Sequence, residues 1–242
     1  MAVAASLTVQ STRGVTGRHD LPPDIVRAQL EELISDRRPD AIKTGVLGRA
    51  DTIREIARLL DEHYSGPLVV DPVIAGGEGG SLIDPGGLEA LVGSLVPRAA
   101  LVTPNTREVA AISGFEVFDV SDMEAAALYV VRLGARAALV TGGVIEEKGR
   151  RLSADVLVDG KGVEVFTGPW LEDASVHGTG CVLSAAITAY LALGMETREA
   201  VVSGREVVRA AMDGAVSPGS GVPCANPRAA GDIGAGGEAA GH

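Results

Sequence analysis

The chain of 242 residues is poor in aromatic side chains and has no cluster of basic ones. Aromatic residues make up only 3% of it, which argues against a surface that stacks nucleic-acid bases. The formal net charge is -11, which disfavours nucleic acid or an anionic membrane as a partner. An anionic ligand would have to be held by local backbone dipoles rather than by the overall field.

Cysteines and long apolar runs are scarce as well. The two cysteines, Cys181 and Cys224, lie far apart and form no CxxC pair, so neither a disulfide framework nor a zinc site is indicated. No apolar run has the length of a membrane helix, and the short apolar start lacks the basic residues of a signal peptide. These absences predict a cytoplasmic protein.

Two common nucleotide-binding motifs are also missing. The sequence contains no GxxxxGK[ST] loop, which excludes a P-loop nucleoside triphosphatase. Two segments begin a G-x-G-x-x-G fingerprint, but the third glycine is replaced by Leu82 in one and by Leu183 in the other. A Rossmann dehydrogenase is therefore disfavoured.

Short β-branched apolar runs alternate with longer amphipathic stretches along the chain. The expected strands are residues 3–9, 41–44, 68–70, 101–102 and 137–140. Helices are expected from about residues 22, 51, 84, 121, 180 and 197, the fourth opened by a capping box of Ser121 and Glu124. Residues 154–158 and 163–166 flank Asp159-Gly160 and predict a β-hairpin.

This alternation predicts an α/β fold with a mostly parallel central sheet, helices on both faces and an antiparallel hairpin at one side. Residues 1–216 are expected to form a single domain. From Ser217 the chain is rich in Gly, Ala, Pro and Ser without periodicity, so residues 217–242 are predicted to be a disordered tail.

Ligands of open parallel sheets bind at the carboxyl ends of the strands, and polar residues gather at these ends here. They are Gln10, Gly45, Asp71-Pro72, Thr103-Pro104-Asn105 and Thr141-Gly142-Gly143. Ordinary turn chemistry explains this gathering equally well. Asp71, which ends a buried strand, is either a catalytic or metal-linked carboxylate or a cap for the following loop.

The segment His177-Gly178-Thr179-Gly180-Cys181 directly precedes an apolar helix. Glycines at a helix start let backbone N–H groups point into a cavity, where they can hold phosphate oxygens. Cys181 would lie in the first turn, where the thiolate form is favoured. The alternative is a Gly-rich turn whose cysteine packs under the helix.

Asn105 and Glu108 stand three residues apart at a helix start. An amide and a carboxylate on one face could hold a hydrated Mg²⁺. Equally, Asn105 could cap the helix with Glu108 as its capping-box partner.

Six segments, in this order, resemble hydroxymethylpyrimidine phosphate kinases of the ribokinase superfamily. They are residues 6–15, residues 41–48 (Ala-Ile-Lys-Thr-Gly-Val-Leu-Gly), Val70-Asp71-Pro72-Val73, Thr103-Pro104-Asn105 with Glu108, Val140-Thr141-Gly142-Gly143 and His177 to Cys181. The similarity runs from the N-terminus to about Met212. It implies a ribokinase-like fold and transfer of a phosphoryl group from ATP, with Mg²⁺, to a pyrimidine and then to its monophosphate.

The resemblance also implies roles for individual residues. Gln10 would hydrogen-bond the pyrimidine and Val46 would line its pocket. Asp71, Asn105 and Glu108 would organise Mg²⁺ and the triphosphate, the metal being held through water by Asp71 and Glu108, with Thr141 and Gly143 beside the nucleotide. His177, Gly178, Thr179 and Gly180 would form an anion hole, and Cys181 would deprotonate or position the attacking hydroxyl. A homo-oligomer is expected by the same analogy.

The sequence departs from the family pattern in three places. The family begins with a strand and a Gly-rich loop carrying an Asp, and this chain starts after that point. Thr141 stands where Lys is usual, and Val176 where Thr is common. The first departure predicts a sheet edge near residues 3–9 without its neighbouring strand, and little activity or poor solubility for the 242-residue form. A pyridoxine or pyridoxal kinase and a non-catalytic pyrimidine-binding relative are the alternatives.

Overall fold

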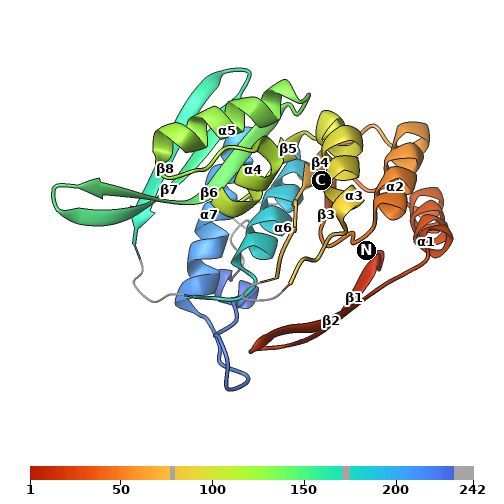
Figure 1. Ribbon diagram of the computed structural model, residues 1–242, viewed down its shortest axis with the longest axis horizontal. Helices are drawn as coiled ribbons and strands as arrows, with labels where there is room; N and C mark the ends of the chain where they lie inside the picture. The colour runs from red at the N-terminus through yellow and green to blue at the C-terminus, as the bar shows by residue number, and fades with distance from the viewer. Residues whose placement is uncertain (77–79, 171–174, 232–242) are drawn as a thin grey trace, which may run out of the picture.

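A computed structural model describes residues 1–76, 80–170 and 175–231. Within them the main sheet has six strands in the order β3-β4-β5-β6-β7-β8 (Figure 1). The first four are parallel neighbours and the last two are antiparallel additions. Their bounds are β3 Ile42–Thr44, β4 Leu68–Val70, β5 Leu101–Val102, β6 Ala137–Glu147, β7 Arg150–Asp159 and β8 Gly162–Pro169. The predicted fold class is confirmed.

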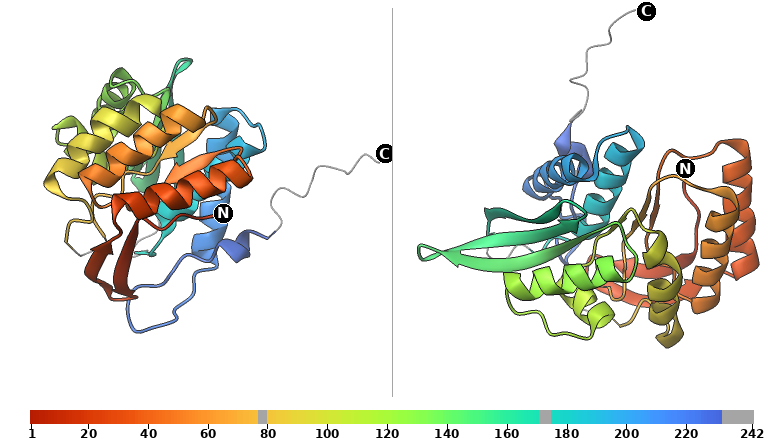
Figure 2. Two further views of the ribbon diagram at one scale, coloured as in Figure 1. Left: turned by 90° about the vertical axis from the view of Figure 1, so that its right-hand side faces the viewer. Right: turned by 90° about the horizontal axis from the view of Figure 1, so that it is seen from above.

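Helices pack on both faces of this sheet because successive strand residues are apolar and point to opposite sides. Val70 and Val102 join the core beneath the first five helices, whereas Val69 and Leu101 join the core beneath the last two. Figure 2 shows these two layers. The first five helices are α1 Pro23–Asp36, α2 Ala50–His63, α3 Pro85–Ala90, α4 Thr106–Ser113 and α5 Val120–Arg132; the last two are α6 Thr179–Ala192 and α7 Thr197–Asp213.

The start of α5 differs in detail from the prediction. The helix is present, but its capping box is formed by Asp119 and Asp122 rather than by Ser121 and Glu124. The Asp122 amide donates to Asp119 Oδ1 over 2.9 Å. Both pairs have the same spacing, so the spacing alone could not select the one that lies at the true helix boundary.

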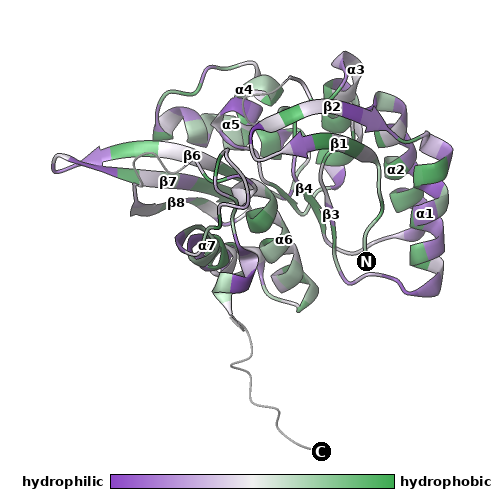
Figure 3. Ribbon diagram, turned by 90° about the horizontal axis from the view of Figure 1, so that it is seen from below, coloured by the Kyte–Doolittle hydropathy of each residue, from purple (hydrophilic) through white to green (hydrophobic). Residues whose placement is uncertain are grey.

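The N-terminal strand is not an edge of the main sheet, which corrects the prediction for residues 3–9. β1 (Ser6–Ser11) pairs antiparallel with β2 (Gly14–Asp20), which the sequence did not predict, in a separate two-stranded sheet (Figure 3). The outer parallel strand of the main sheet is β3 instead. A tight turn that ends at Gly14, with φ +125°, makes this pairing local.

Strand β6 continues through Thr141-Gly142-Gly143, where the sequence predicted its end. Gly142 has φ +82°, and the pairing register with β7 shifts between Val140 and Gly143. A bulge of this kind redirects a strand without ending it. The predicted hairpin at residues 154–166 is confirmed as part of the longer pair β7 and β8.

Residues 217–231 are not a disordered tail. Val216 and Cys224 exchange two backbone hydrogen bonds, a 3₁₀-helix spans Pro227–Ala230, and Ala230 is buried. The glycines and prolines of this segment therefore lie in an ordered, turning chain rather than in a disordered one. Residues 232–242 lie outside the described part of the chain. No helix in the described ranges is long and apolar enough to cross a membrane.

Candidate functional site

Asp71 is a buried carboxylate directly after β4, only 5% exposed. Ser184 of α6 donates its hydroxyl to Asp71 Oδ2 over 2.7 Å, and Lys43 Nζ of β3 lies 3.3 Å from the same oxygen. A buried charge needs such partners. The sequence did not single out Lys43 or Ser184, which lie 28 and 113 residues away along the chain. Only Lys43, in the family-like run of residues 41–48, carried any signal.

The N-terminus of α6 also lies at the carboxyl ends of the parallel strands, and its N-cap residue has no side chain that could cap the helix. Gly178 is its N-cap residue, with φ +87°, and among the described residues the N-cap has no side-chain hydrogen bond. Of the described residues, none has a heavy atom within 4 Å of the place that a Cβ at Gly180 would take. Unpaired amides at a helix start, with open space before them, suit phosphate oxygens. The predicted anion hole at His177 to Gly180 therefore has a suitable backbone.

Two threonine hydroxyls add unused hydrogen-bonding capacity at this edge. Thr44 ends β3, and Thr103 directly follows β5. Their Oγ1 atoms are buried and have no hydrogen-bond partner in the part of the chain that the structure describes. Unpaired buried hydroxyls are costly, so a polar ligand at this edge would be stabilising.

Cys181 lies in the first turn of α6, and its side chain is exposed. Partial removal from water raises the pKa of its thiol, and the carboxylate of Asp71, close enough for a side-chain hydrogen bond, raises it further. Lys43 opposes this shift. This shift runs opposite to the expectation that the helix start would favour the thiolate, and its largest cause is the removal of the thiol from water.

Asn105 and Glu108 form the capping box of α4. Asn105 Oδ1 accepts from the amides of Arg107 and Glu108, both over 2.9 Å, and Glu108 Oε2 accepts from the Asn105 amide over 2.9 Å. Burial raises the pKa of Glu108 to about 7, with a further contribution from the charge of Asp71. Glu108 thus has a structural role and still lies near Asp71.

A metal ion would need more than these carboxylates. Across the described residues, no group of three or more His, Cys, Asp or Glu side chains could hold a metal ion. Mg²⁺ accepts few protein ligands when phosphate oxygens and water complete its shell. Asp71 and Glu108 fit that arrangement.

Thr141 and Gly143, predicted beside the nucleotide, lie in different surroundings. The Thr141 amide donates to Pro104 O over 3.0 Å, which places Thr141 beside Asn105. Gly143 is buried, and a Cβ there would approach Met123 Sδ to 2.3 Å. Gly143 therefore allows close packing against α5, whereas Thr141 lies at the edge that carries Asn105 and Glu108.

Gln10 and His177, which are 167 residues apart, are brought together. The Gln10 side-chain amide contacts the ring Nε2 of His177. Gln10 Oε1 also accepts from Thr8 over 3.3 Å. Val46 is half-buried in the loop after β3. Gln10 therefore lies next to the predicted anion hole.

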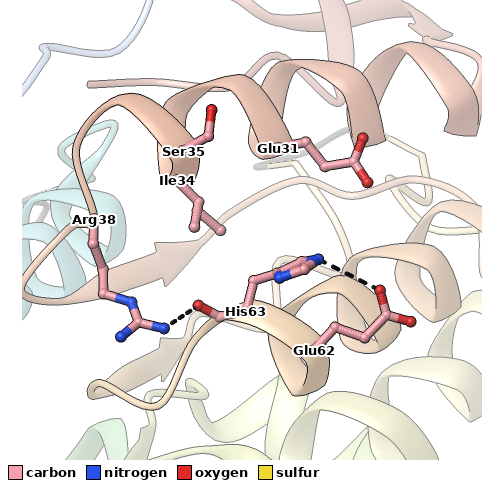
Figure 4. A pocket seen from close by; sticks show the side chains of 6 residues that line it. All are labelled: Glu31, Ile34, Ser35, Arg38, Glu62 and His63. Atoms are coloured by element: carbon pink, nitrogen blue, oxygen red, sulfur yellow. Dashed lines mark hydrogen bonds and ion pairs between the residues drawn. The ribbon is translucent and has the colours of Figure 1, made fainter.

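A separate hollow of about 530 Å³ lies between the C-terminal halves of α1 and α2 (Figure 4). Arg38 donates to the His63 carbonyl there, and His63 pairs with Glu62 over 3.6 Å. Helix α1 leads into the start of β3, and α2 leads into the start of β4. The hollow therefore lies at the amino ends of these strands, whereas Asp71 lies at their carboxyl ends. None of the predicted site residues lines it.

A buried aspartate, an adjacent thiol and an uncapped helix N-terminus lie together at the carboxyl ends of a mostly parallel sheet, an arrangement that suits a small-molecule kinase of the ribokinase type. The family model described as phosphomethylpyrimidine kinase matches residues 1–226. The chain belongs to this family and is a phosphotransferase.

Curated relatives agree with this assignment. The chain is 40% identical over 211 residues to the thiamine biosynthesis bifunctional protein ThiED of Geobacter sulfurreducens, covering 87% of this chain and 42% of that relative. It is 35% identical over 221 residues to the hydroxymethylpyrimidine/phosphomethylpyrimidine kinase of Bacillus subtilis, covering 91% and 81% of the two chains. The chain thus spans less than half of the first relative and most of the second.

Solved structures show the same fold. Phosphomethylpyrimidine kinase from Clostridium difficile is 33% identical, with a TM-score of 0.74 over 86% of this chain and 84% of that one. The pyridoxal kinase of Staphylococcus aureus in complex with AMP-PCP and pyridoxal is 32% identical, with a TM-score of 0.79 over 90% and 77% of the two chains. The second structure holds an ATP analogue, which supports the use of ATP in this fold.

Proposed function

We propose that this protein transfers a phosphoryl group from ATP to the hydroxymethyl group of 4-amino-5-hydroxymethyl-2-methylpyrimidine, and then to its monophosphate, in thiamine biosynthesis. The observation that carries the proposal is the meeting of Asp71, Cys181 and the uncapped start of α6 at one edge of the sheet. Phosphoryl transfer depends mainly on positioning and on stabilisation of charge.

The amides of residues 178 to 180 would hold the transferred phosphoryl group. A positive φ at Gly178 turns the chain into the helix, and the open space at Gly180 lets a phosphate approach the backbone. Mg²⁺, when bound, would neutralise charge on the phosphates. Asp71 and Glu108 would hold it through water, with Lys43 fixing the orientation of Asp71.

Cys181 would act on the attacking hydroxyl. Because its thiol pKa is raised, the group enters the reaction as a neutral thiol. In the proposed step the hydroxyl proton passes to Cys181 Sγ while the thiol proton passes to the carboxylate of Asp71. The hydroxyl oxygen then forms its bond to the terminal phosphorus of ATP as the bond between that phosphorus and the leaving ADP breaks.

Gln10 would select the substrate ring. Its amide already contacts His177 and its carbonyl accepts from Thr8, so the pyrimidine would replace one or both of these partners. Val46 would contribute an apolar wall. An amide that offers both a donor and an acceptor suits the ring nitrogen and amino group of an aminopyrimidine.

The test is ATP-dependent phosphorylation by the purified 242-residue chain of the hydroxymethylpyrimidine, its monophosphate and pyridoxal, with Mg²⁺ present or chelated. The proposal expects both pyrimidines to be phosphorylated in preference to pyridoxal, and only with Mg²⁺, at the low rate predicted above for the 242-residue form. Preference for pyridoxal would instead support the second candidate, which the similarity to pyridoxal kinase favours. Binding of the pyrimidine without any turnover would identify a non-catalytic relative.

Two further features stay predictions from the family resemblance. The protein is expected to form a homo-oligomer in the cytoplasm. Light scattering of the purified chain tests the first, and fractionation of the producing cells tests the second.

A further inference from the structure

The tip of the β1–β2 hairpin is held by a segment close to the C-terminus, residues 216–226, which we call the strap. The Val222 amide donates to Thr12 O over 2.9 Å, and the Gly221 amide donates to Thr12 Oγ1 over 3.1 Å. Residues about 210 positions apart thus form a direct junction at the hairpin turn.

The strap also holds the residue that precedes the anion-hole glycines. The His177 amide donates to Pro223 O over 2.7 Å, and the Ala225 amide donates to His177 O over 2.9 Å. The strap is anchored in turn to α7, because the Asn226 amide donates to Ala211 O over 2.9 Å. His177 is therefore fixed on both sides of its backbone.

The β1 strand of the hairpin buries little apolar surface, so apolar packing does little to fix its position. Five of the six residues of β1 are exposed, and the Leu7 and Val9 side chains are 53% and 64% exposed. Since buried apolar area is the main source of fixed packing, the position of Gln10 depends on polar contacts. Those contacts are its own with His177 and the junction of Thr12 with the strap.

Gly221 is the residue that makes the junction possible. A Cβ at this position would lie 2.1 Å from Thr12 O, 2.3 Å from Thr12 C and 2.6 Å from the Arg13 amide nitrogen. These are backbone atoms, which cannot rotate away as a flexible side chain can. Any other residue at position 221 would push the strap and the hairpin turn apart.

We propose that the strap is a positioning element of the substrate site: through Gly221 and Val222 it sets Gln10 against His177 and so determines the affinity for the pyrimidine ring. This inference rests on the proposed function for the identity of the substrate. The strap touches neither Asp71 nor Cys181 in the contacts described above, and Gly221 and Val222 bind Thr12, whereas Pro223 and Ala225 bind His177. The junction at Gly221 should therefore govern binding of the ring rather than transfer of the phosphoryl group.

The test compares Gly221→Ala with Gly160→Ala, whose added Cβ would meet no atom within 4 Å. Gly221→Ala should raise the KM for the hydroxymethylpyrimidine roughly tenfold, as expected for the loss of about two hydrogen bonds. The kcat and the KM for ATP should stay within about twofold of the parent. Gly160→Ala should leave all three constants unchanged. Amide exchange at Val222 should be faster only in Gly221→Ala.

A second pair of variants probes the same junction from the hairpin side. Thr12→Val removes the hydroxyl that accepts from Gly221, whereas Thr12→Ser keeps it. Thr12→Val should raise the pyrimidine KM a few-fold, and Thr12→Ser should match the parent. An unchanged KM in Gly221→Ala despite faster exchange would overturn the proposal. So would equal losses in kcat and both KM values together with a lower Tm, because they would indicate a general structural role.

The two proposals fail in different ways. If the parent phosphorylates no pyrimidine, the proposed function is wrong, and the strap is then judged by the pyrimidine Kd from calorimetry in place of KM. A weaker Kd in Gly221→Ala but not in Gly160→Ala would still support the positioning role. A parent that does not bind the pyrimidine would overturn both.

Discussion

Asp71 follows a strand whose three residues are all buried, whereas Gln10 lies in a strand in which five of six residues are exposed. The sheet and α6 hold Asp71 through the core and through Ser184. The strap and His177 hold Gln10 through a few polar contacts at the surface. Under the proposed function, the Asp71 side of the site supplies a fixed geometry for the chemistry, and the Gln10 side an adjustable surface for recognition.

Removal of the thiol beside Asp71 should have the largest effect on the reaction. Cys181→Ala should lower kcat about 10²- to 10⁴-fold, the usual range for loss of a proton-transferring group. ATP binding and Tm should stay close to the parent, because the Cys181 side chain is exposed. The measurement is steady-state phosphorylation with calorimetry of ATP binding.

Cys224→Ala is the matched control, since Cys224 is the other free cysteine and is half-buried in the strap. The strap uses the backbone rather than the side chain of Cys224 in the hydrogen bonds described above, so this variant should keep the parent kcat. Activity of Cys181→Ala within a few-fold of the parent would show that Cys181 only packs.

A pH titration of stability tests the raised pKa of Glu108. Its folded pKa of about 7 lies above the ordinary value of 4.5, so the folded state holds a proton that the unfolded state has lost between these pH values. The contribution of Glu108 to stability should therefore be greatest below about pH 4.5 and should fall as the pH rises towards 7, by at most about 3 kcal/mol. Partial exposure of Glu108 reduces that figure.

Glu108→Gln should remove this loss of stability, because glutamine keeps the capping interaction but cannot ionise. The measurement is chemical denaturation between pH 4.5 and 8 without nucleotide. Glu116→Gln, which changes an exposed carboxylate nearby, should retain the parent's pH dependence. A parent whose stability does not fall over this range would contradict the raised pKa.

The next effect concerns the partner of Asp71. Ser184→Ala removes the 2.7 Å hydrogen bond to a buried carboxylate, so the free energy of unfolding should fall by about 1–3 kcal/mol. Loss of the fixed orientation should also lower kcat by about tenfold. Thr188→Val is the control, because Thr188 Oγ1 donates to Ser184 O over 2.7 Å in the same helix and not to Asp71. It should destabilise the protein without lowering kcat comparably; an equal fall in kcat would assign Ser184 a packing role.

Much of the sheet-held side could be predicted from the sequence, and the reason is local. The residues of β4 and β5 alternate between two cores, and their short β-branched runs end at Asp71 and at Thr103. The glycines before α6 indicated an open helix start. The bonds that Lys43 and Ser184 make to Asp71 were not predictable, because they join different elements and depend on the finished packing.

The hairpin and the strap could not be predicted for a different physical reason. Neither buries a continuous apolar face, so β2 gives no periodic signal, and the Gly- and Pro-rich strap has the composition of a disordered tail. Its order comes from backbone hydrogen bonds to Thr12 and His177, and backbone groups are the same in every residue. Only the close approach at Gly221 gives glycine a specific reason to be there.

The smallest expected effect is at Gly180, where the two sides of the site meet at the first turn of α6. A methyl group there enters open space, since a Cβ at this position would have no heavy atom within 4 Å. Gly180→Ala should therefore leave the free energy of unfolding unchanged or slightly increased, because alanine favours a helix over glycine by about 0.5–1 kcal/mol. The same methyl group would stand in the space where a phosphate approaches the amides, and the Kd for ATP should rise roughly fivefold, equivalent to one weakened hydrogen bond.

Gly93→Ala is the control, because Gly93 is also helical and equally open but lies in the segment after α3, away from the site. Calorimetry of ATP binding and thermal unfolding of both variants give the result: a fall in affinity confined to Gly180→Ala places the phosphate at the start of α6, and equal ATP affinity in the two variants would show that the nucleotide binds elsewhere.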